Sequence, residues 1–454
     1  MSVPSLQTLH LFNRLCFGGR LQDLDNPEAA IWKEPASASK QLFSSIPCYK
    51  PLKSYSEEFM VDKSEFARVE ENRKVYPNSF DEITHNWLRH TADSANPIRE
   101  KAALFWMHFI PVIGESEARV KPLMEIYRKH ALVKLEDLFF DLFLNPNFMS
   151  FLTAVNSTKD SPNQNLAREF MELFTLGVNH YTENDVRELA RCFAGFVQPD
   201  EKIQMLSLKA EHQDFGEKTL LGQRKAYDYK EAIRWIIAQP QTSKFIAKRV
   251  LQFYLTTEPI AEMVEACAEV YHASGHQFRC LLEFMVSQPW FYDAKYMGNK
   301  VKTPIELLLQ FQHQTGLRTY GLMCHWHLQR WLGQQLFNPP SVGGWPDGNQ
   351  WLNGSVLVSR LSLLRNLLII ANRTHPKNDF AYKLHSWLSY YSLRLFRWNM
   401  DAKFDEDAYL AALEKHKNSE SHWLLGSGAS KLSAKEQTSL GLSELLQHPY
   451  YQYC

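Results

Sequence analysis

The sequence predicts a mainly α, multi-helix globular protein. Glycine and proline, the residues that most often interrupt helices, number only 19 and 21 among 454 residues, which is below the roughly 12% that they make up on average. In most interpretable segments the apolar residues recur every three or four positions, as in helices with one buried face. With 45% hydrophobic and 22% charged residues, the composition is that of an ordinary globular protein.

Two adjacent helices are predicted around residues 163–192. The first has apolar residues at helical spacing, Asn163 or Asn165 can cap its start, and Gly177 can end it. A tight turn at 179–181 follows. The second helix begins with a capping-box pattern at Thr182 and can stop by Gly195. If the two helices pack antiparallel, their polar faces meet in a charged groove.

Further helices are expected from the same periodicity, and two segments depart from it. The expected helices are 98–109, 136–144, 229–237, 243–254, 261–272, 278–286, 303–314 and 355–372. Residues 205–211 alternate in polarity and are followed by a turn at Asp214 and by 219–221, a pattern that predicts a small β-hairpin over 205–221. Residues 337–354 are rich in proline and glycine and predict a long structured loop, a kind of segment that is often functional.

The charge balance limits the partners and the compartment. The 50 basic and 50 acidic residues cancel, whereas a protein that binds nucleic acid non-specifically, or an anionic membrane surface, needs surplus positive charge. No segment approaches the roughly 20 apolar residues of a membrane span, and residues 1–19 lack the pattern of a signal peptide. Seven cysteines without a CxxC pair are typical of free thiols in a reducing compartment. We therefore expect a cytoplasmic protein.

Six segments carry a family resemblance. They read, in chain order, REKAALFWMHF, NQNLAREFMELFTLGV, YTENDVRELARCFAGF, HQDFGEKTLLG, GNKVKTPIEL and LGQQLFNPPSVGGWPDGNQWLN. Together they resemble a large bacterial family that is catalogued as a domain of unknown function, number eighteen hundred. The resemblance covers about residues 5–453 and implies a single helical domain, with two lobes at about 1–200 and 201–454 as the alternative.

What the resemblance implies about function is limited, because the family has no established reaction. Many of its members look secreted, unlike this chain, in which we see no export signal. Their genes often lie beside those of a second family that is similar to alkaline phosphatases and sulfatases. The resemblance therefore implies a phosphatase- or sulfatase-like protein as a partner.

The polar side of the first predicted helix is the strongest candidate site. Asn165, Glu169 and Glu172 share one side at helical spacing, with Arg168 beside them. Two carboxylates one turn apart can hold a divalent metal, or can act as acid and base if their environments differ. The alternative is a set of ordinary surface ion pairs. The match to the family's motif favours the functional interpretation.

A second candidate is the turn 212–219, which concentrates an imidazole, carboxylates and an ammonium group. His212 and Asp214 could take part in catalysis or bind metal, and Lys218 could hold an anionic substrate with backbone amides near Gly216. The alternative is a polar turn in which Asp214 satisfies its own backbone.

Three further residues are candidates on chemical grounds. His108 is flanked by large apolar groups and corresponds to the family's own histidine. It could ligate a metal together with Glu169 and Glu172, although a lone histidine there is more often part of the core. Trp345 and Asn353 could bind substrate, because an aromatic ring on a rigid turn is a platform for a sugar or an anchor for a partner. A tryptophan that fills the core beneath the loop is at least as plausible. We interpret the segment 324–327, Cys-His-Trp-His, as structural.

The two functions that remain belong to different classes. There is no GxSxG, GxxxxGK[ST], GxGxxG or HExxH motif, so common hydrolase, NTPase and dehydrogenase routes lack support. The leading hypothesis is a metal-assisted hydrolase that acts on a glycan or on a phosphate or sulfate ester. The rival is a non-enzymatic binding or scaffold protein, in which the same residues form a structural network and the Trp345 loop contacts a partner.

Overall fold

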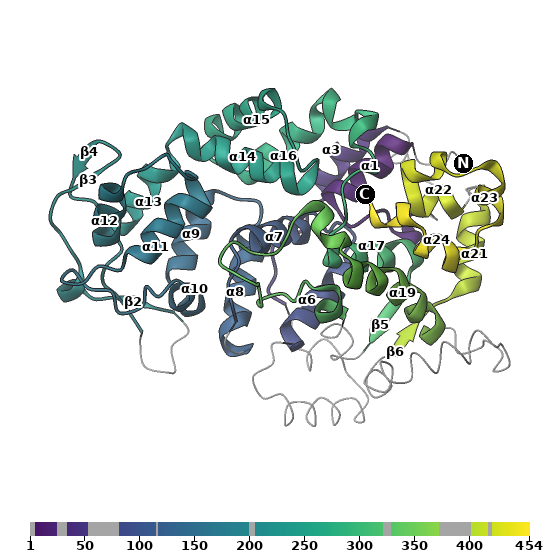
Figure 1. Ribbon diagram of the computed structural model, residues 1–454, viewed down its shortest axis with the longest axis horizontal. Helices are drawn as coiled ribbons and strands as arrows, with labels where there is room; N and C mark the ends of the chain where they lie inside the picture. The colour runs from purple at the N-terminus through teal and green to yellow at the C-terminus, as the bar shows by residue number, and fades with distance from the viewer. Residues whose placement is uncertain are drawn as a thin grey trace.

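The computed structural model describes residues 5–24, 34–52, 81–114, 117–198, 205–320, 328–371, 401–415 and 420–454. It confirms the mainly α fold (Figure 1). In the first half, the helices are α1 Leu6–Leu15, α2 Leu21–Leu24, α3 Pro35–Ser44, α6 Asp81–Asp93, α7 Ile98–Phe109, α8 Glu117–Lys129, α9 Leu135–Phe143, α10 Pro146–Phe151, α11 Gln164–Glu169 and α12 Glu183–Cys192. In the second half, they are α13 Tyr229–Ile237, α14 Pro240–Tyr254, α15 Ala261–Ala273, α16 Phe278–Ser287, α17 Pro304–Thr315, α19 Gly354–Ala371, α21 Glu406–Lys415, α22 Glu420–Leu425, α23 Ala434–Ser439 and α24 Leu442–Gln447.

Shorter turns of other helix types connect these elements. Phe170–Thr175 (η2) is a π-helix that continues α11. The 3-10 turns are Ala210–His212 (η3), Pro289–Tyr292 (η4), Ala294–Tyr296 (η5), Gly348–Leu352 (η6), Gly426–Lys431 (η7) and Pro449–Gln452 (η8). The predicted start of α12 is confirmed, because Thr182 and Asp185 form a reciprocal capping box. The segment 324–327 lies outside the described residues.

The described strands form three two-stranded antiparallel sheets, and the predicted hairpin over 205–221 is wrong in its pairing. β2 (Ser207–Leu208) pairs with β1 (Phe196–Val197), and β3 (Lys218–Leu220) pairs with β4 (Gln223–Lys225). β5 (Arg318–Tyr320) pairs with β6 (Asp401–Lys403). Leu221 and Gly222 both have positive φ, the backbone of a two-residue hairpin turn, so Lys218–Leu220 folds onto the strand that follows it. Alternating polarity identified the strands but did not identify their partners.

The predicted long loop is present at 337–354 and is interrupted by η6. It is packed tightly against the end of α7. Gly344 has a φ of +88°, and a Cβ atom there would lie 2.9 Å from the main-chain oxygen of His108. Only glycine meets both conditions without strain. The main-chain oxygen of Phe337 also accepts a hydrogen bond from Gly114, at 2.8 Å.

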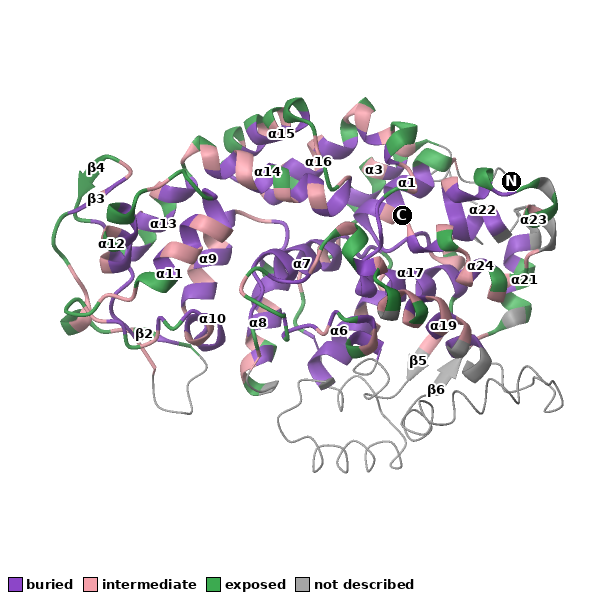
Figure 2. Ribbon diagram, in the orientation of Figure 1, coloured by how far each residue is buried: buried purple, intermediate pink, exposed green. Residues whose placement is uncertain are grey.

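A continuous hydrophobic core runs from Leu9 to Tyr451. Two helices of this core, α7 and α17, are buried almost all round (Figure 2). Elements on either side of residue 200 pack together, since α12 contacts β3 and α9 contacts α13. The division into two lobes stays a prediction.

Figure 1 shows how the elements are arranged. Helices α9 to α13 and the strands β2 to β4 form one end of the molecule, and α21 to α24 form the other. Helices α14 to α16 lie along one side, whereas α7, α17 and α19 occupy the middle. Within the described residues, none of the helices has both the length and the apolar character needed to span a membrane.

Candidate functional site

The first candidate helix does not keep one helical geometry. Asn163 caps α11 by accepting a hydrogen bond from the amide of Asn165, at 2.8 Å. After Glu169 the backbone widens into the π-helix, so Glu172 lies in a turn of different pitch. The single polar stripe expected from α-helical spacing is therefore broken between the two carboxylates. π-helical turns of this kind often occur at functional sites.

Most polar side chains of this segment make local structural bonds. The Asn165 amide donates to the main-chain oxygen of Leu152, at 3.1 Å. Arg168 donates two hydrogen bonds to Glu183 at the start of α12, at 2.6 and 2.7 Å. Glu172 accepts a hydrogen bond from the hydroxyl of Tyr181, at 2.6 Å. These contacts join α11 and η2 to the turn and helix that follow.

Glu169 is the exception in this segment. Its side chain is half-buried, and it makes no hydrogen bond or ion pair with the described residues. Burial raises the pKa of the Glu169 carboxyl, the negative charge of Glu172 raises it further, and Arg168 opposes both. A carboxyl group with a raised pKa keeps its proton at higher pH than an ordinary one, so it is better suited to act as a general acid.

The turn 212–218 is held by a network of charges. Arg191 of α12 donates to both carboxylate oxygens of Asp214, at 2.7 and 3.3 Å, and the Gly216 amide donates to the same carboxylate at 2.8 Å. Lys218 is buried and donates to the main-chain oxygens of Asp214 and Tyr227. Burial would raise the pKa of Asp214, but the bonds from Arg191 and Gly216 hold it below its ordinary value.

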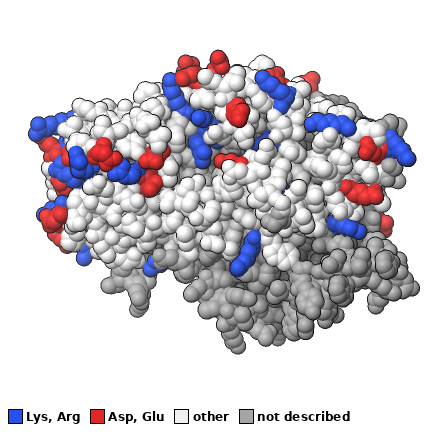
Figure 3. Space-filling view, viewed as in Figure 1, with Lys and Arg blue, Asp and Glu red and all other residues white. Residues whose placement is uncertain are grey.

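Two further carboxylates of α12 hold the β3–β4 hairpin. Glu188 accepts a hydrogen bond from the Thr219 amide at 2.9 Å, and Asp185 accepts one from the Leu221 amide at 2.7 Å. Acidic and basic side chains are intermixed at this end of the molecule (Figure 3). Asp185 and Glu188 therefore fix the position of the hairpin, and Arg191 ties Asp214 to the same helix. The side chain of His212 is half-buried and makes no hydrogen bond with the described residues.

Phe215 is the residue of this turn that the sequence reasoning missed. It lies between Asp214 and Gly216, and 68% of its surface is exposed, the largest value among the exposed large hydrophobic residues of the described part. The surrounding network fixes its backbone. In the sequence, an aromatic residue between Asp214 and Gly216 of a predicted turn was the available sign that an aromatic ring is exposed there.

His108 and the Trp345 loop form a separate cluster. The Nε2 atom of His108 lies 3.0 Å from a carboxylate oxygen of Asp347, and its ring stacks on Trp345 with 6.0 Å between ring centroids. Burial would raise the pKa of Asp347, but the hydrogen bond and charge of His108 hold it below its ordinary value. Trp345 is only 6% exposed, and Asn353 accepts a hydrogen bond from the Val356 amide at the start of α19, at 3.4 Å.

The proposed metal ligands are not assembled. His108 lies on α7 in the middle of the molecule, whereas Glu169 and Glu172 lie in the segment at one end (Figure 1). Among the described residues, no three or more His, Cys, Asp and Glu side chains are grouped so that they could hold a metal ion. Within the part of the chain that the structure describes, a metal bound by Glu169 and Glu172 has no third protein ligand grouped with them.

A buried basic centre, also missed by the sequence reasoning, lies between α7 and α17. Glu306 accepts hydrogen bonds from Lys101 at 2.6 Å and from Lys300 at 3.2 Å. It also accepts one from the Thr303 amide, at 2.7 Å, which completes a capping box at the start of α17. All three charged side chains are less than 10% exposed.

Three more buried cations lie near Glu306, Lys101 and Lys300. We call the whole set the basic centre: Arg14, Lys101, Lys300, Lys302 and Arg360, with Glu306. Lys302 donates to the main-chain oxygen of Tyr451 at 2.6 Å, and Arg360 donates to the main-chain oxygen of Lys302 at 2.7 Å. Arg14 donates to the thiol of Cys454 at 3.2 Å. Aromatic faces cover several of these cations, as with Lys302 over the Tyr451 ring at 3.9 Å.

Burial changes the titration of the basic centre strongly. It lowers the pKa of Lys101, although Glu306 opposes the effect, and it lowers the pKa of Lys302 to about 7 and that of Arg360 to about 10. Burial acts to raise the pKa of Glu306, but Lys101 and Lys300 hold it far below its ordinary value. Lysines set among apolar residues in GNKVKTPIEL and REKAALFWMHF were the available signal, because lysine is almost never buried without a partner.

Comparisons with known proteins identify the family alone. No curated protein and no solved structure is significantly similar to this chain. The model of one protein family matches residues 10–453, nearly the whole chain, and its description is "Protein of unknown function (DUF1800)". The chain belongs to the DUF1800 family.

Proposed function

We propose that the protein is a non-enzymatic binding or scaffold protein that contacts a phosphatase- or sulfatase-like protein through the turn around Phe215. The observation that supports this proposal is the network that holds Asp214 and Lys218 in structural bonds while it leaves Phe215 exposed. Trp345 is buried, so it is less suited than Phe215 to serve as the partner anchor.

The geometry of the turn suits an anchor. Burying an exposed aromatic side chain supplies a large part of the binding energy at many interfaces. Because the Gly216 amide and Arg191 already fix the turn, little backbone entropy is lost when a partner binds. The exposed pair Arg224 and Glu217 lies beside it, 2.7 Å apart, and supplies a polar rim.

The test is a binding titration between the purified protein and a purified phosphatase- or sulfatase-like protein encoded in the same genome. Phe215→Ala should weaken binding by at least about tenfold, as expected for an interface hot spot. Val358→Ala is the matched control, since Val358 is 67% exposed but lies on α19. The proposal fails if the wild-type protein does not bind, or if both variants bind as the wild type does.

We also propose that the protein works in the cytoplasm. The described residues include six cysteines, and all six are free thiols. Free thiols persist in reducing compartments. Cell fractionation with an antibody to the protein tests this, and recovery in an exported fraction would contradict it.

A second candidate function rests on Glu169. Its raised pKa, next to Glu172 and at the start of a π-helical turn, is an arrangement that could supply a general acid. We propose it as the acid of a metal-assisted hydrolase for glycans or for phosphate or sulfate esters. Aryl glycosides, phosphates and sulfates should then be cleaved in the presence of a divalent metal, and Glu169→Gln should abolish cleavage while Glu183→Gln leaves it unchanged.

The metal content of the purified protein tests the same candidate independently. A stoichiometric divalent metal should be present in the wild-type protein and absent from the folded Glu169→Gln, Glu172→Gln double variant. Equal metal in both proteins, or absence of turnover on all three substrate classes, would remove this candidate.

A further inference from the structure

The basic centre holds more positive than negative charge. Arg14, Lys101, Lys300, Lys302 and Arg360 are all less than 10% exposed, and Glu306 is the carboxylate that lies among them. Burial lowers the pKa of both Lys101 and Lys302, although the negative charge of Glu306 opposes it. Burying unpaired charge is costly, so buried cations normally have anionic partners.

Several donors in the basic centre have no acceptor. The Nε atom of Arg14, the Nη1 atom of Arg360 and the side-chain amide nitrogen of Gln452 are buried and make no hydrogen bond with the described residues. The Gln452 side chain already accepts a hydrogen bond from Arg360 at 2.9 Å, so its free nitrogen lies close to the same guanidinium group. Each unsatisfied donor adds a desolvation cost that an acceptor would remove.

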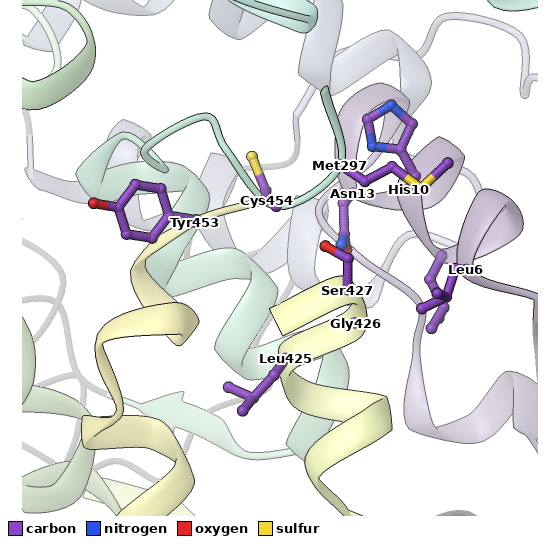
Figure 4. A pocket seen from close by; sticks show the side chains of 11 residues that line it. Leu6, His10, Asn13, Met297, Leu425, Gly426, Ser427, Tyr453 and Cys454 are labelled. Atoms are coloured by element: carbon purple, nitrogen blue, oxygen red, sulfur yellow. The ribbon is translucent and has the colours of Figure 1, made fainter. Parts of the chain in front are cut away.

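A pocket is lined in part by Cys454, whose thiol accepts a hydrogen bond from Arg14 (Figure 4). Asn13, Gly298, Tyr453 and Cys454 are among the residues that line it. Asn13 and Tyr453 directly adjoin Arg14 and Gln452 in the sequence, so the pocket borders the basic centre.

The pocket itself contains a further unsatisfied group. His10 is 2% exposed and lines the pocket. Its Nε2 atom lies 3.0 Å from the main-chain oxygen of Phe291, while Nδ1 has no partner in the described part. The ring therefore uses Nε2 as a donor and leaves Nδ1 as an acceptor. A water molecule or a protonated oxyanion in the pocket would satisfy it.

We propose that the basic centre binds a small inorganic anion, chloride or phosphate, that enters through the pocket beside Cys454. The anion supplies the missing negative charge and accepts hydrogen bonds from the free nitrogens of Arg14, Arg360 and Gln452. It thereby joins α1 and α19 to the segment 449–454. This role is separate from partner binding at Phe215, which lies in the turn before β3. The β3–β4 hairpin belongs to the end of the molecule that α9 to α13 form (Figure 1).

The first test compares thermal unfolding of the full-length protein in sodium gluconate, sodium chloride and sodium phosphate at equal ionic strength and pH. A ligand that binds only the folded state raises the unfolding temperature with its concentration. We expect a saturable rise in chloride or phosphate over gluconate, and the two arms distinguish the two anions. Equal unfolding temperatures in all three salts would overturn the proposal.

The second test uses matched variants. Arg360→Met removes an unpaired donor and one positive charge, so the selective effect of the anion should be lost. Arg224→Met is the control, because Arg224 is an exposed cation in a surface ion pair, and it should keep the full effect. An equal anion effect in both variants would contradict the site.

A third measurement does not depend on a variant that folds. Crystals soaked in sodium bromide should show an anomalous bromide peak within hydrogen-bonding distance of Arg14, Arg360 or Gln452, and the peak should diminish when excess phosphate or chloride competes. Bromide that binds at the surface alone would overturn the proposal. An unfolding temperature that rises above pH 7 by the same amount with and without the anion would also overturn the proposal. Deprotonation of Lys302, and not a bound anion, would then remove the excess positive charge of the basic centre.

Discussion

Asp214 and Glu306 both accept hydrogen bonds from basic side chains, but their surroundings differ. The Arg191 side chain that pairs with Asp214 is 30% exposed, so water and salt screen that pair. Lys101 and Glu306 are 1% and 4% exposed as side chains, so their interaction is little screened. The charged interaction in the turn of Asp214, which is conspicuous in the sequence, is therefore the weaker of the two. The stronger one is hidden among apolar residues in α7 and α17.

The largest effect is expected from Glu306→Gln. The change leaves Lys101 and Lys300 without their carboxylate, and breaking a buried ion pair from one side typically costs about 3–5 kcal/mol. Urea unfolding followed by circular dichroism would measure the loss. A loss below about 1 kcal/mol, as for a surface pair, would show that the basic centre is better hydrated than its burial indicates.

Lys302→Met should change the pH dependence of stability. The pKa of Lys302 is about 7 in the folded protein and about 10.4 in an unfolded chain. Between these values the unfolded chain binds more protons, so wild-type stability should rise with pH, by up to about 1.4 kcal/mol per pH unit. The variant should lack this rise. Urea midpoints at pH 7, 8 and 9 test the prediction, and parallel profiles for the two proteins would contradict it.

Asp214→Asn should have a smaller, local effect. The variant keeps the shape of the side chain but loses the charge-assisted bonds from Arg191, at a cost of about 1–2 kcal/mol before solvent screening reduces it. Hydrogen exchange should accelerate at the amides of Gly216 and Thr219 and remain unchanged in α17. Because the pKa of Asp214 is lowered in the folded state, this stabilisation is present above about pH 4 and is lost as the pH falls through the folded value.

Arg168→Ala should have the smallest effect. Arg168 donates two hydrogen bonds to Glu183, but the two side chains are 36% and 65% exposed, so salt screens their attraction. The unfolding midpoint should match that of the wild type at physiological ionic strength. A loss as large as that of Asp214→Asn would mean that exposure does not account for the difference between the two regions.

Local features of the fold could be predicted well. The helices predicted at 98–109 and 229–237 have these bounds in the structure, because apolar spacing and end residues act within a few positions. The start of α12 at Thr182 was predictable for the same reason. The partner of Ser207–Leu208 was not, because strand pairing depends on contacts that alternating polarity does not specify.

In the candidate site too, contacts between residues close in the sequence could be predicted, whereas contacts between distant residues could not. Asp214 and Lys218 are four residues apart and interact, as their shared turn indicated. His108 and Asp347 interact across 239 positions of the sequence, and no local pattern links them. The basic centre was missed because the charges of Lys101 and Glu306, viewed along the sequence, resemble ordinary helix surface charges. Only packing shows that α7 and α17 are buried on all sides.

The bond between Arg14 and Cys454 has a consequence for the order of folding. It joins residues 440 positions apart, and Lys302 depends in the same way on the main-chain oxygen of Tyr451. During synthesis the helices α1, α7 and α17 emerge before the segment that completes their polar contacts. Contacts of such long range form slowly, because loop-closure entropy is lost before they contribute. Docking of the segment 449–454, which completes the polar contacts in the middle of the protein, is therefore expected to be a slow step of folding.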